Sequence, residues 1–437
     1  MCRLPAAVLC RAPGLVAISF DHSGRTTSAY AGLRDATSTD PISLDTTLWM
    51  ASMSKSAVSL AALVLVERES FDMDSNAKLA EVLPELKLGN GESLDKIFDG
   101  KDEKGEWKTR SAKVGITLRH LLLHTSGLGY FFTSEEDAMQ HEPLGPLPPV
   151  TTGAESAFNV VRSFEAGEKF LYGCSTDWVA RFIERKTGLT LRAALKTLIF
   201  DPLGVPSDQL DLYRSEGMNE NCSAIHAKVA PGTFIPIPFD TPQFDVPPPG
   251  FVPLASAGLW GYVPLYFFLD STTHDLNHLS GSTLPAWVEF LQCLLHESAP
   301  SSGGPPLISK KLWDEATQDG LGPMGVKLPP LVLTTADPQL CSNLGVYSEA
   351  MDETVEEKEG WTMLSTVVNK TKSRSGKSVG AHGWAGLSNS YYFVDPEAGV
   401  GGVIVAQFLP FADEEMLKLR DEFESLIYRQ LECAVEV

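Results

Sequence analysis

Basic residues are scarce in this sequence. Its 437 residues include 35 Lys and Arg against 56 Asp and Glu, a formal net charge of −21 at pH 7, and no stretch is rich in Lys or Arg. A chain with this charge is repelled by phosphate backbones and by anionic lipid surfaces. We therefore expect neither nucleic acid nor a membrane as a partner.

Long apolar runs are also missing. The longest, residues 258–269, contains Pro264 and is too short to span a bilayer, which takes about 20 apolar residues. The apolar N-terminus, residues 1–20, is broken by Arg11 and the Pro-Gly pair that follows. It fits a strand over residues 15–20 better than a secretory signal. We expect a cytoplasmic protein.

Cysteine is sparse and without pattern. An odd number of seven cysteines without Cys-x-x-Cys spacing indicates neither a disulfide framework nor a zinc site and fits a reducing compartment. His120 and His124 stand four residues apart, but no acidic third ligand lies nearby, so helix packing and a bond to the following turn explain them better than a metal does. We expect no metal and no other cofactor. The cysteines are Cys2, Cys10, Cys174, Cys222, Cys293, Cys341 and Cys433.

Strand patterns are present at both ends of the chain. Residues 15–20 and 26–33 flank a turn-like cluster, and residues 390–394 and 401–407 form a second β-rich pair. An amphipathic pattern over residues 414–432 predicts a terminal helix. The sequence therefore predicts an α+β fold, an α/β sandwich in which one antiparallel sheet from both chain ends is flanked by helices.

The middle of the chain reads as mostly helical with long loops. We expect one domain over residues 1–437, with the sheet in residues 1–70 and 379–437 and the helical region in about 71–378. Residues 89–113 predict an exposed loop and residues 143–149 a proline-rich loop. A second proline-rich loop, at 230–253, could wall a pocket. Helices are predicted over residues 48–67, 76–88, 155–164, 175–186, 191–200, 287–297 and 309–317, and a short one from Thr117 as cap to Gly127.

The helix predicted at residues 48–67 carries a candidate nucleophile. Ser52 and Lys55 are three apart at the start of an apolar run, so their side chains share one face, one turn apart. A lysine can take the proton of a serine hydroxyl when burial lowers its pKa. The spacing also occurs at Ser75 and Ser93, in polar segments. A helix cap with a snorkelling lysine is therefore the alternative.

Other motifs resemble the serine β-lactamase and penicillin-binding-protein-like superfamily, in its esterase and transesterase branch. The fungal acyltransferases of the lovastatin side-chain type look most similar. The resemblance runs from about residue 13 to the end and implies the β-lactamase-like fold. It rests on residues 49–55 (WMASMSK), 116–128 (ITLRHLLLHTSGL), 172–178 (YGCSTDW), 184–188 (ERKTG), 201–204 (DPLG) and 382–386 (HGWAG).

The resemblance implies a role for each motif. Ser52 would be the acylated nucleophile, and Lys55 and Tyr172 would share and shuttle its proton. The backbone N–H groups of Ser52 and Ala385 would form the oxyanion hole. Tyrosine and lysine have similar ordinary pKa values, so we expect the proton to pass between them at little cost, and a positive pocket would favour the phenolate.

Two departures separate this chain from β-lactamases. Cys174 stands where the tyrosine motif usually has Asn or Ser. His382, Gly383 and Trp384 stand where β-lactamases have Lys-Thr-Gly, whose lysine helps to hold a substrate carboxylate. A neutral histidine and a tryptophan suit an uncharged acyl group better, so we assign these three residues to substrate binding.

The expected function is acyl transfer through an acyl-enzyme onto an alcohol of a small metabolite in secondary metabolism. The expected partners are a small-molecule acyl donor, the alcohol acceptor and an acyl-carrier domain as a further candidate. Two alternatives remain: a carboxylesterase-type hydrolase and a non-catalytic binding protein that retains the fold.

Two features of the chain differ from the family pattern. Residues 262–282 look like an insertion, since GLWG before them would otherwise continue directly into TLPAW. Family members also usually have a helix before the first strand, and only about a dozen residues precede residue 15 here. We predict that residues 262–282 are an insertion. An error of gene modelling is one candidate origin for it.

Overall fold

A computed structural model describes residues 12–130, 133, 135–141, 145, 155–206, 208–212, 218, 220–237, 281–329 and 358–435. Several predictions fall mainly outside these residues. They are the proline-rich loops, all of the expected insertion except Gly281 and Ser282, and the start of the N-terminal apolar segment.

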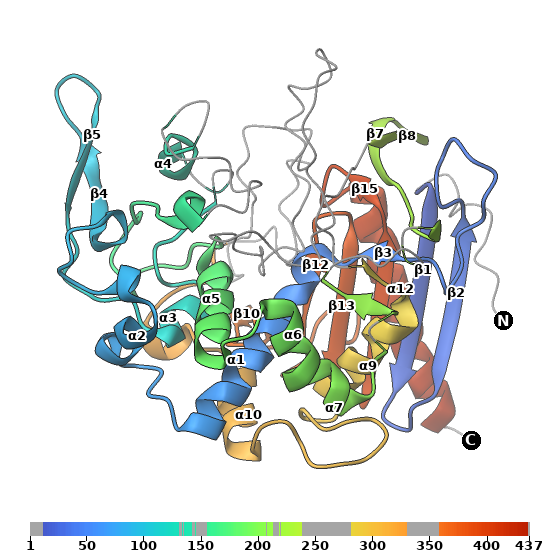
Figure 1. Cartoon of the computed structure of the whole chain (residues 1–437). Helices are drawn as coiled ribbons and strands as arrows, with labels where there is room; N and C mark the ends of the chain where they lie inside the picture. The colour runs from blue at the N-terminus through green and yellow to red at the C-terminus, as the bar shows by residue number, and fades with distance from the viewer. Residues whose placement is uncertain are drawn as a thin grey trace.

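A seven-stranded antiparallel sheet of order β10-β11-β12-β13-β14-β1-β2 forms one side of the molecule (Figure 1). Its centre joins the two ends of the chain, because Leu15 of β1 lies opposite Ala406 of β14 on one side and Ala31 of β2 on the other. The predicted fold class is confirmed. The strands are β1 (Gly14–Asp21), β2 (Thr26–Gly32), β10 (Glu359–Trp361), β11 (Val367–Asn369), β12 (His382–Gly386), β13 (Ser390–Asp395) and β14 (Val400–Ala406).

The helices fall close to their predicted positions. Buried α1 follows a 3-10 turn, η2 (Ala51–Ser54), and packs against α5. The helix that begins at α6 continues through a π-helical turn, Lys196–Phe200, and ends at Gly204 with a φ of 72°. The bounds are α1 (Lys55–Glu69), α2 (Asn76–Val82), α3 (Leu118–Leu122), α4 (Glu135–Ala138), α5 (Ser175–Thr187), α6 (Leu191–Leu195), α7 (Asp201–Leu203), α9 (Leu284–Leu295), α10 (Lys310–Thr317) and α12 (Glu414–Val435).

Alternation along β13 separates the two faces of the sheet. Phe393 stacks on Tyr428 of α12 with ring centroids 6.0 Å apart. Its neighbour Tyr392 points to the other face, where it lies 6.4 Å from Trp287 of α9 and bonds Ser56 of α1. Successive strand residues point to opposite faces. The sheet is therefore covered by α12 on one face and by α1 and α9 on the other.

Strands appear in parts of the chain where none was predicted. The short strands β10 and β11 extend the sheet into the region expected to be helical, and residues 89–113 hold a hairpin, β4 (Lys96–Lys101) and β5 (Trp107–Ser111), instead of a loop. In that hairpin Phe98 packs on Trp107 with ring centroids 5.3 Å apart. These strands are short or highly charged, so pairing with a neighbour decides their conformation and the local pattern does not.

Three predicted helices are shorter than expected. The one from residue 76 ends at Val82, because Pro84 lacks an N–H and disfavours helix at the residue before it. Thr117 caps α3 as predicted, but α3 ends at Leu122, well before Gly127. Residues 155–164 contain only a 3-10 turn, Glu155–Phe158.

Two small three-stranded sheets connect the loops to the rest of the fold. β15 (Phe408–Leu409) pairs with β7 (Ile225–Ala230), which pairs with β8 (Thr233–Ile237). The last two residues of the expected insertion form β9 (Gly281–Ser282), which lies between β3 (Leu48–Trp49) and β6 (Leu210–Asp211). The end of that segment is thus paired with the strand that leads to Ser52.

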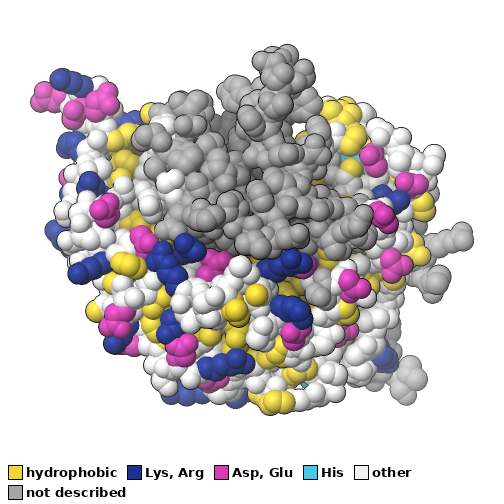
Figure 2. Space-filling model, viewed as in Figure 1, with side chains coloured by type: hydrophobic (Ala, Val, Ile, Leu, Met, Phe, Trp, Pro, Cys, Tyr) yellow, Lys and Arg dark blue, Asp and Glu magenta, His cyan; other side chains and the backbone are white. Residues whose placement is uncertain are grey.

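The surface of the described part carries both signs of charge. In Figure 2 basic and acidic side chains are interspersed over the visible face, with apolar side chains between them. Among the described helices none is long and apolar enough to cross a bilayer.

Candidate active site

The turn that carries Ser52 is held from two directions. The backbone N–H of Trp49 donates to the side-chain oxygen of Gln407 (2.9 Å). At the end of β12, Gly386 approaches so closely that a Cβ there would lie 2.6 Å from the carbonyl oxygen of Met50. Ala51 has a positive φ of 46°, which is strained for a residue with a Cβ. The turn therefore presents Ser52 at the first turn of a buried helix, next to the sheet.

Lys55 lies within reach of the Ser52 hydroxyl. Its Nζ is 3.0 Å from Ser52 Oγ, and the lysine side chain is fully buried. Desolvation lowers the pKa of Lys55 to about 7, and the negative charge of Asp177 opposes that decrease. A substantial fraction of Lys55 is therefore neutral near pH 7 and able to accept the serine proton.

The other two Ser-x-x-Lys pairs have no such geometry. Ser75 caps α2, and Lys78 is more than half exposed and bonds Glu81. Ser93 begins a short 3-10 turn that ends before Lys96. Burial distinguishes Lys55 from both. The cap interpretation fails for Ser52, because Ser52 lies inside η2 and the N-cap residues of η2 and α1 are Met50 and Ser54.

Tyr172 completes the group around the hydroxyl. Its side chain lies close enough to Ser52 to interact with it, and its oxygen accepts from Trp384 Nε1 (3.3 Å). Burial raises the pKa of Tyr172 above its ordinary value, so the phenol stays protonated. The expected match of lysine and tyrosine pKa values, and with it the phenolate, is therefore wrong. Burial disfavours both charged forms and moves the two pKa values apart.

His124 holds the segment that carries Tyr172. Its carbonyl oxygen accepts from the N–H of Leu171 (2.9 Å), its Nδ1 accepts from the N–H of Gly173 (3.3 Å), and its Nε2 lies 3.3 Å from Thr176 Oγ1. Burial lowers the pKa of His124 well below its ordinary value, so the imidazole is neutral. The sequence predicted a bond to the following turn for this histidine but missed its contact with the tyrosine motif. The sequence signal that could have indicated this contact is the position of His124 directly before a Thr-Ser-Gly turn.

The residues of the third motif divide into two groups. Trp384 contacts Tyr172, with ring centroids 5.3 Å apart. Ala385 pairs with Tyr391 of β13 and directly precedes Gly386, which approaches the Ser52 turn at Met50. Gly383 has no room for a side chain, because a Cβ would lie 2.1 Å from the Tyr392 carbonyl oxygen.

His382 lies inside the fold, away from solvent. Its Nδ1 is 3.3 Å from Thr366 Oγ1, and burial lowers its pKa to about 4. It is therefore neutral at pH 7, as expected for a site that binds an uncharged acyl group. Its hydrogen-bond partner is Thr366 and not Ser52, and its part in substrate binding stays a prediction.

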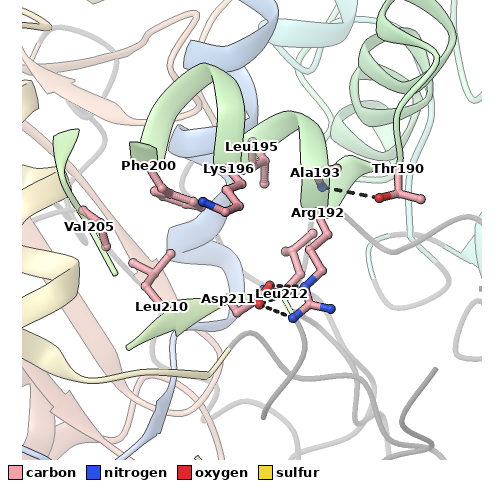
Figure 3. A pocket seen from close by; sticks show the side chains of 10 residues that line it. All are labelled: Thr190, Arg192, Ala193, Leu195, Lys196, Phe200, Val205, Leu210, Asp211 and Leu212. Carbon is pink, nitrogen blue, oxygen red and sulfur yellow. Dashed lines mark hydrogen bonds and ion pairs between the residues drawn. The ribbon is translucent and has the colours of Figure 1, made fainter. Parts of the chain in front are cut away.

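A separate cavity of about 340 Å³ lies between α6 and β6 (Figure 3). The Arg192 guanidinium bonds both carboxylate oxygens of Asp211 at its edge (2.5 to 2.9 Å). Apolar side chains such as Phe200 and Leu210 line the rest. None of its lining residues belongs to the group around Ser52.

Comparison with known proteins places this geometry in a family. A family model described as Beta-lactamase matches residues 9–261, more than half of the chain. The chain belongs to the beta-lactamase family. The match includes the segments that carry Ser52, Lys55 and Tyr172, and the recognition made from the motifs is confirmed.

Curated relatives within this beta-lactamase family include acyltransferases and esterases. Acyltransferase mokF of Monascus pilosus is 34% identical over 200 residues, 44% of this chain and 46% of the relative. Lovastatin esterase of Penicillium rubens is 32% identical over 171 residues, 39% of this chain and 41% of the relative. The chain spans about half the length of the curated relatives it matches.

The fold agrees over a longer range. Unliganded simvastatin synthase of Aspergillus terreus superposes with a TM-score of 0.71 at 22% identity, covering 97% of this chain and 95% of the other. At this identity the likeness supports the beta-lactamase fold alone.

Proposed function

We propose that this chain is a serine acyl-enzyme catalyst that moves an acyl group onto an alcohol of a small metabolite in secondary metabolism. One observation carries the proposal: Lys55 Nζ lies 3.0 Å from Ser52 Oγ inside the fold, and the side chain of Tyr172 interacts with Ser52. A serine, a lysine with a lowered pKa and a protonated phenol together provide a nucleophile, a base and an acid.

The first half-reaction uses all three groups. Ser52 Oγ attacks the acyl carbonyl while neutral Lys55 takes the hydroxyl proton. Tyr172 gives its proton to a departing alkoxide and regains one from the Lys55 ammonium, whereas a departing thiolate, less basic than the phenolate, takes its proton from the Lys55 ammonium. The N–H groups of Ser52 and Ala385 stabilise the oxyanion. In the second half-reaction an alcohol attacks the ester of Ser52 by the reverse proton path.

Hydrolysis is the second candidate, since water can replace the alcohol in the second half-reaction. Relatives of similar identity bear both kinds of name, acyltransferase and esterase. Ser52, Tyr172 and Trp384 are each less than a tenth exposed. A site that restricts water favours an alcohol acceptor, and this supports transfer over hydrolysis.

The properties of buried side chains also bear on the acyl donor and the cellular location. We propose an uncharged acyl group, delivered as a small ester or thioester or on an acyl-carrier domain, because the imidazole of His382 is neutral. We also propose a single catalytic domain over residues 1–437 and a cytoplasmic location. The thiols of Cys174 and Cys293 are free and buried, which fits a reducing compartment. The mechanism needs no cofactor.

Partition experiments test the proposal. Purified protein is incubated with a short-chain p-nitrophenyl ester or acyl thioester, with and without an alcohol, and ester and acid products are measured. Transfer predicts that the alcohol captures most of the acyl group, and hydrolysis predicts that the acid forms regardless. Ser52→Ala should abolish both products and Ser75→Ala, the matched serine of a second Ser-x-x-Lys pair, should not. A binding protein without catalysis would give no acyl adduct by intact mass with the wild type.

A further inference from the structure

A buried carboxylate that the proposed proton path does not use lies behind Lys55. Asp177 is in the first turn of α5 and its side chain is 1% exposed. The hydroxyl of Tyr130 donates to Asp177 Oδ2 (3.3 Å). A buried carboxylate is costly without compensating charge or hydrogen bonds, so its location beside the site needs a physical reason.

Tyr130 connects this carboxylate to Lys55. Lys55 Nζ lies 5.8 Å from the centroid of the Tyr130 ring and 4.9 Å from that of Tyr172. The two rings are 5.9 Å apart and nearly perpendicular, at 68°. Aromatic faces attract an ammonium group at these distances. The ring whose hydroxyl bonds Asp177 is therefore one of the two rings that enclose the amine.

The charge of Asp177 acts on the amine directly. Burial lowers the pKa of Lys55, and the attraction of Asp177 for the ammonium raises it again. Without that attraction the amine would be a weaker base.

The titratable groups around Lys55 and Asp177 come from five segments. His124 is kept neutral by burial, which lowers its pKa, and burial raises the pKa of Tyr172 and of the Cys174 thiol, so both stay protonated. The charge of Asp137 acts with that of Asp177 on Cys174. The groups are Lys55 from α1, His124 and Tyr130 from the segment after α3, Asp137 from α4, Tyr172 and Cys174 from the segment before α5, and Asp177 from α5 itself.

We propose that Asp177 is a positioning residue for the catalytic base: through the Tyr130 hydroxyl and through its own charge, it holds Lys55 between two aromatic rings with Nζ directed at Ser52. This inference rests on the proposed function and deepens it. Lys55 is stabilised as the ammonium that forms when Ser52 is acylated, and it returns as a free amine because burial lowers its pKa.

The pH dependence of Ser52 labelling by a fluorophosphonate tests this role without knowledge of the natural substrate. Asp177→Asn keeps the shape and an oxygen for Tyr130 but removes the charge. It should move the acidic limb of the labelling rate to lower pH by roughly half a unit or more, because a nearby opposite charge shifts a buried pKa by about that amount or more. It should also lower the rate on the alkaline plateau, since a less basic lysine is a poorer proton acceptor. A merely structural role would lower the rate at every pH and leave the limb in place.

Asp137→Asn is the matched control. Asp137 is fully buried and close to the same thiol, but Asp177 is the charge that shifts the pKa of Lys55. Asp137→Asn should therefore leave the limb where it is in the wild type. If it moves the limb as far as Asp177→Asn does, the role assigned to Asp177 is wrong.

Tyr130→Phe tests the hydrogen bond between Tyr130 and Asp177, and it keeps the aromatic ring beside Lys55. It should lower the plateau rate about fivefold or more, the size of one lost hydrogen bond of about 1 kcal/mol. The double variant with Asp177→Asn should be little slower than Asp177→Asn alone, since the two residues act as one unit. If Asp177→Asn does not fold, an unchanged rate in Tyr130→Phe overturns the proposal.

The two proposals can fail separately. Labelling of the wild type that Ser52→Ala abolishes, together with an unmoved limb in Asp177→Asn, would overturn the role of Asp177 and leave the acyl-enzyme in place. Labelling that persists in Ser52→Ala would overturn the acyl-enzyme itself.

Discussion

The imidazole of His124 stacks on the phenol of Tyr172, with ring centroids 4.9 Å apart and an angle of 29° between the planes. The same imidazole bonds the residue after Tyr172 through Nδ1 and Thr176 through Nε2. Because the N–H of Gly173 donates to Nδ1, the ring proton is on Nε2 and can be donated to Thr176. The neutral tautomer thus fixes both the ring and the backbone of the tyrosine motif.

Replacing His124 should therefore impair catalysis more than binding. His124→Phe keeps a ring against Tyr172 but removes both side-chain bonds. We expect kcat to fall roughly tenfold to a hundredfold with little change in KM, because a small displacement of a proton donor is costly. The free energy of unfolding should fall by about 1–3 kcal/mol, the cost of unsatisfied buried groups. Steady-state kinetics and urea unfolding measure the two effects.

His120 supplies the control for that variant. It lies one turn earlier, and its Nδ1 accepts from the N–H of Thr117 (3.2 Å) in a capping box. His120→Gln retains that type of cap, so kcat should remain within about twofold of the wild type. An equal loss of kcat in both variants would show that the effect of His124 is general destabilisation.

Two buried tyrosines allow a direct test of the proton donor. Tyr172 interacts with Ser52, and Tyr392 bonds Ser56 of the same helical segment, and burial raises the pKa of both tyrosines. Tyr172→Phe should lower kcat by roughly 10²- to 10⁴-fold, as loss of a general acid does. Tyr392→Phe should cost about 1 kcal/mol of stability and leave kcat unchanged. The idea fails if Tyr172→Phe retains full activity with a donor whose leaving group needs protonation.

The acidic limb of activity should report Lys55. Its pKa is about 7, and only the neutral amine can accept the Ser52 proton, so acylation should weaken as pH falls below about 7. Among the neighbouring histidines, His120 and His382 have pKa values lowered to about 4, so neither titrates in this range. Single-turnover acylation between pH 5 and 9 measures the limb. A rate that is constant over this range would contradict a lysine base.

The same lysine should make stability depend on pH. Its pKa is lowered from an ordinary 10.5 to about 7 in the folded protein, so between these values the unfolded chain binds more protons than the folded one. The contribution of Lys55 to the free energy of unfolding must then rise as pH increases from about 7 toward 10.5. Lys55→Met removes the titration. Its stability advantage over the wild type should shrink by roughly 2 kcal/mol between pH 7 and pH 9, measured by urea unfolding; an advantage that grows with pH would refute the assignment.

Local pattern and motif order predicted much of the fold and the site. The hairpins at the two ends show alternation and turn residues, and α5 and α12 show amphipathic spacing, so these elements could be placed in advance. Ser52, Lys55 and Tyr172 were found through motif resemblance, because the Ser-x-x-Lys spacing alone also occurs at Ser75 and Ser93.

Long-range pairing and burial account for what could not be predicted. β10 and β11 are only three residues long and take their conformation from pairing, β10 with β11 and β11 with β12. The separation of the Lys55 and Tyr172 pKa values depends on their desolvation, which arises only when α1, α5 and the sheet pack together. The bond between Tyr130 and Asp177 joins residues 47 positions apart, and no spacing rule connects them.

The pairing of β1 with β14 also has a consequence for synthesis of the chain. β1 and the serine helix leave the ribosome long before β14, the strand that fills the other side of β1. At about 5–20 residues per second, the wait is on the order of tens of seconds. During that time an apolar strand edge lies open to other chains. Production of this protein should therefore depend on chaperones more than its final stability would suggest.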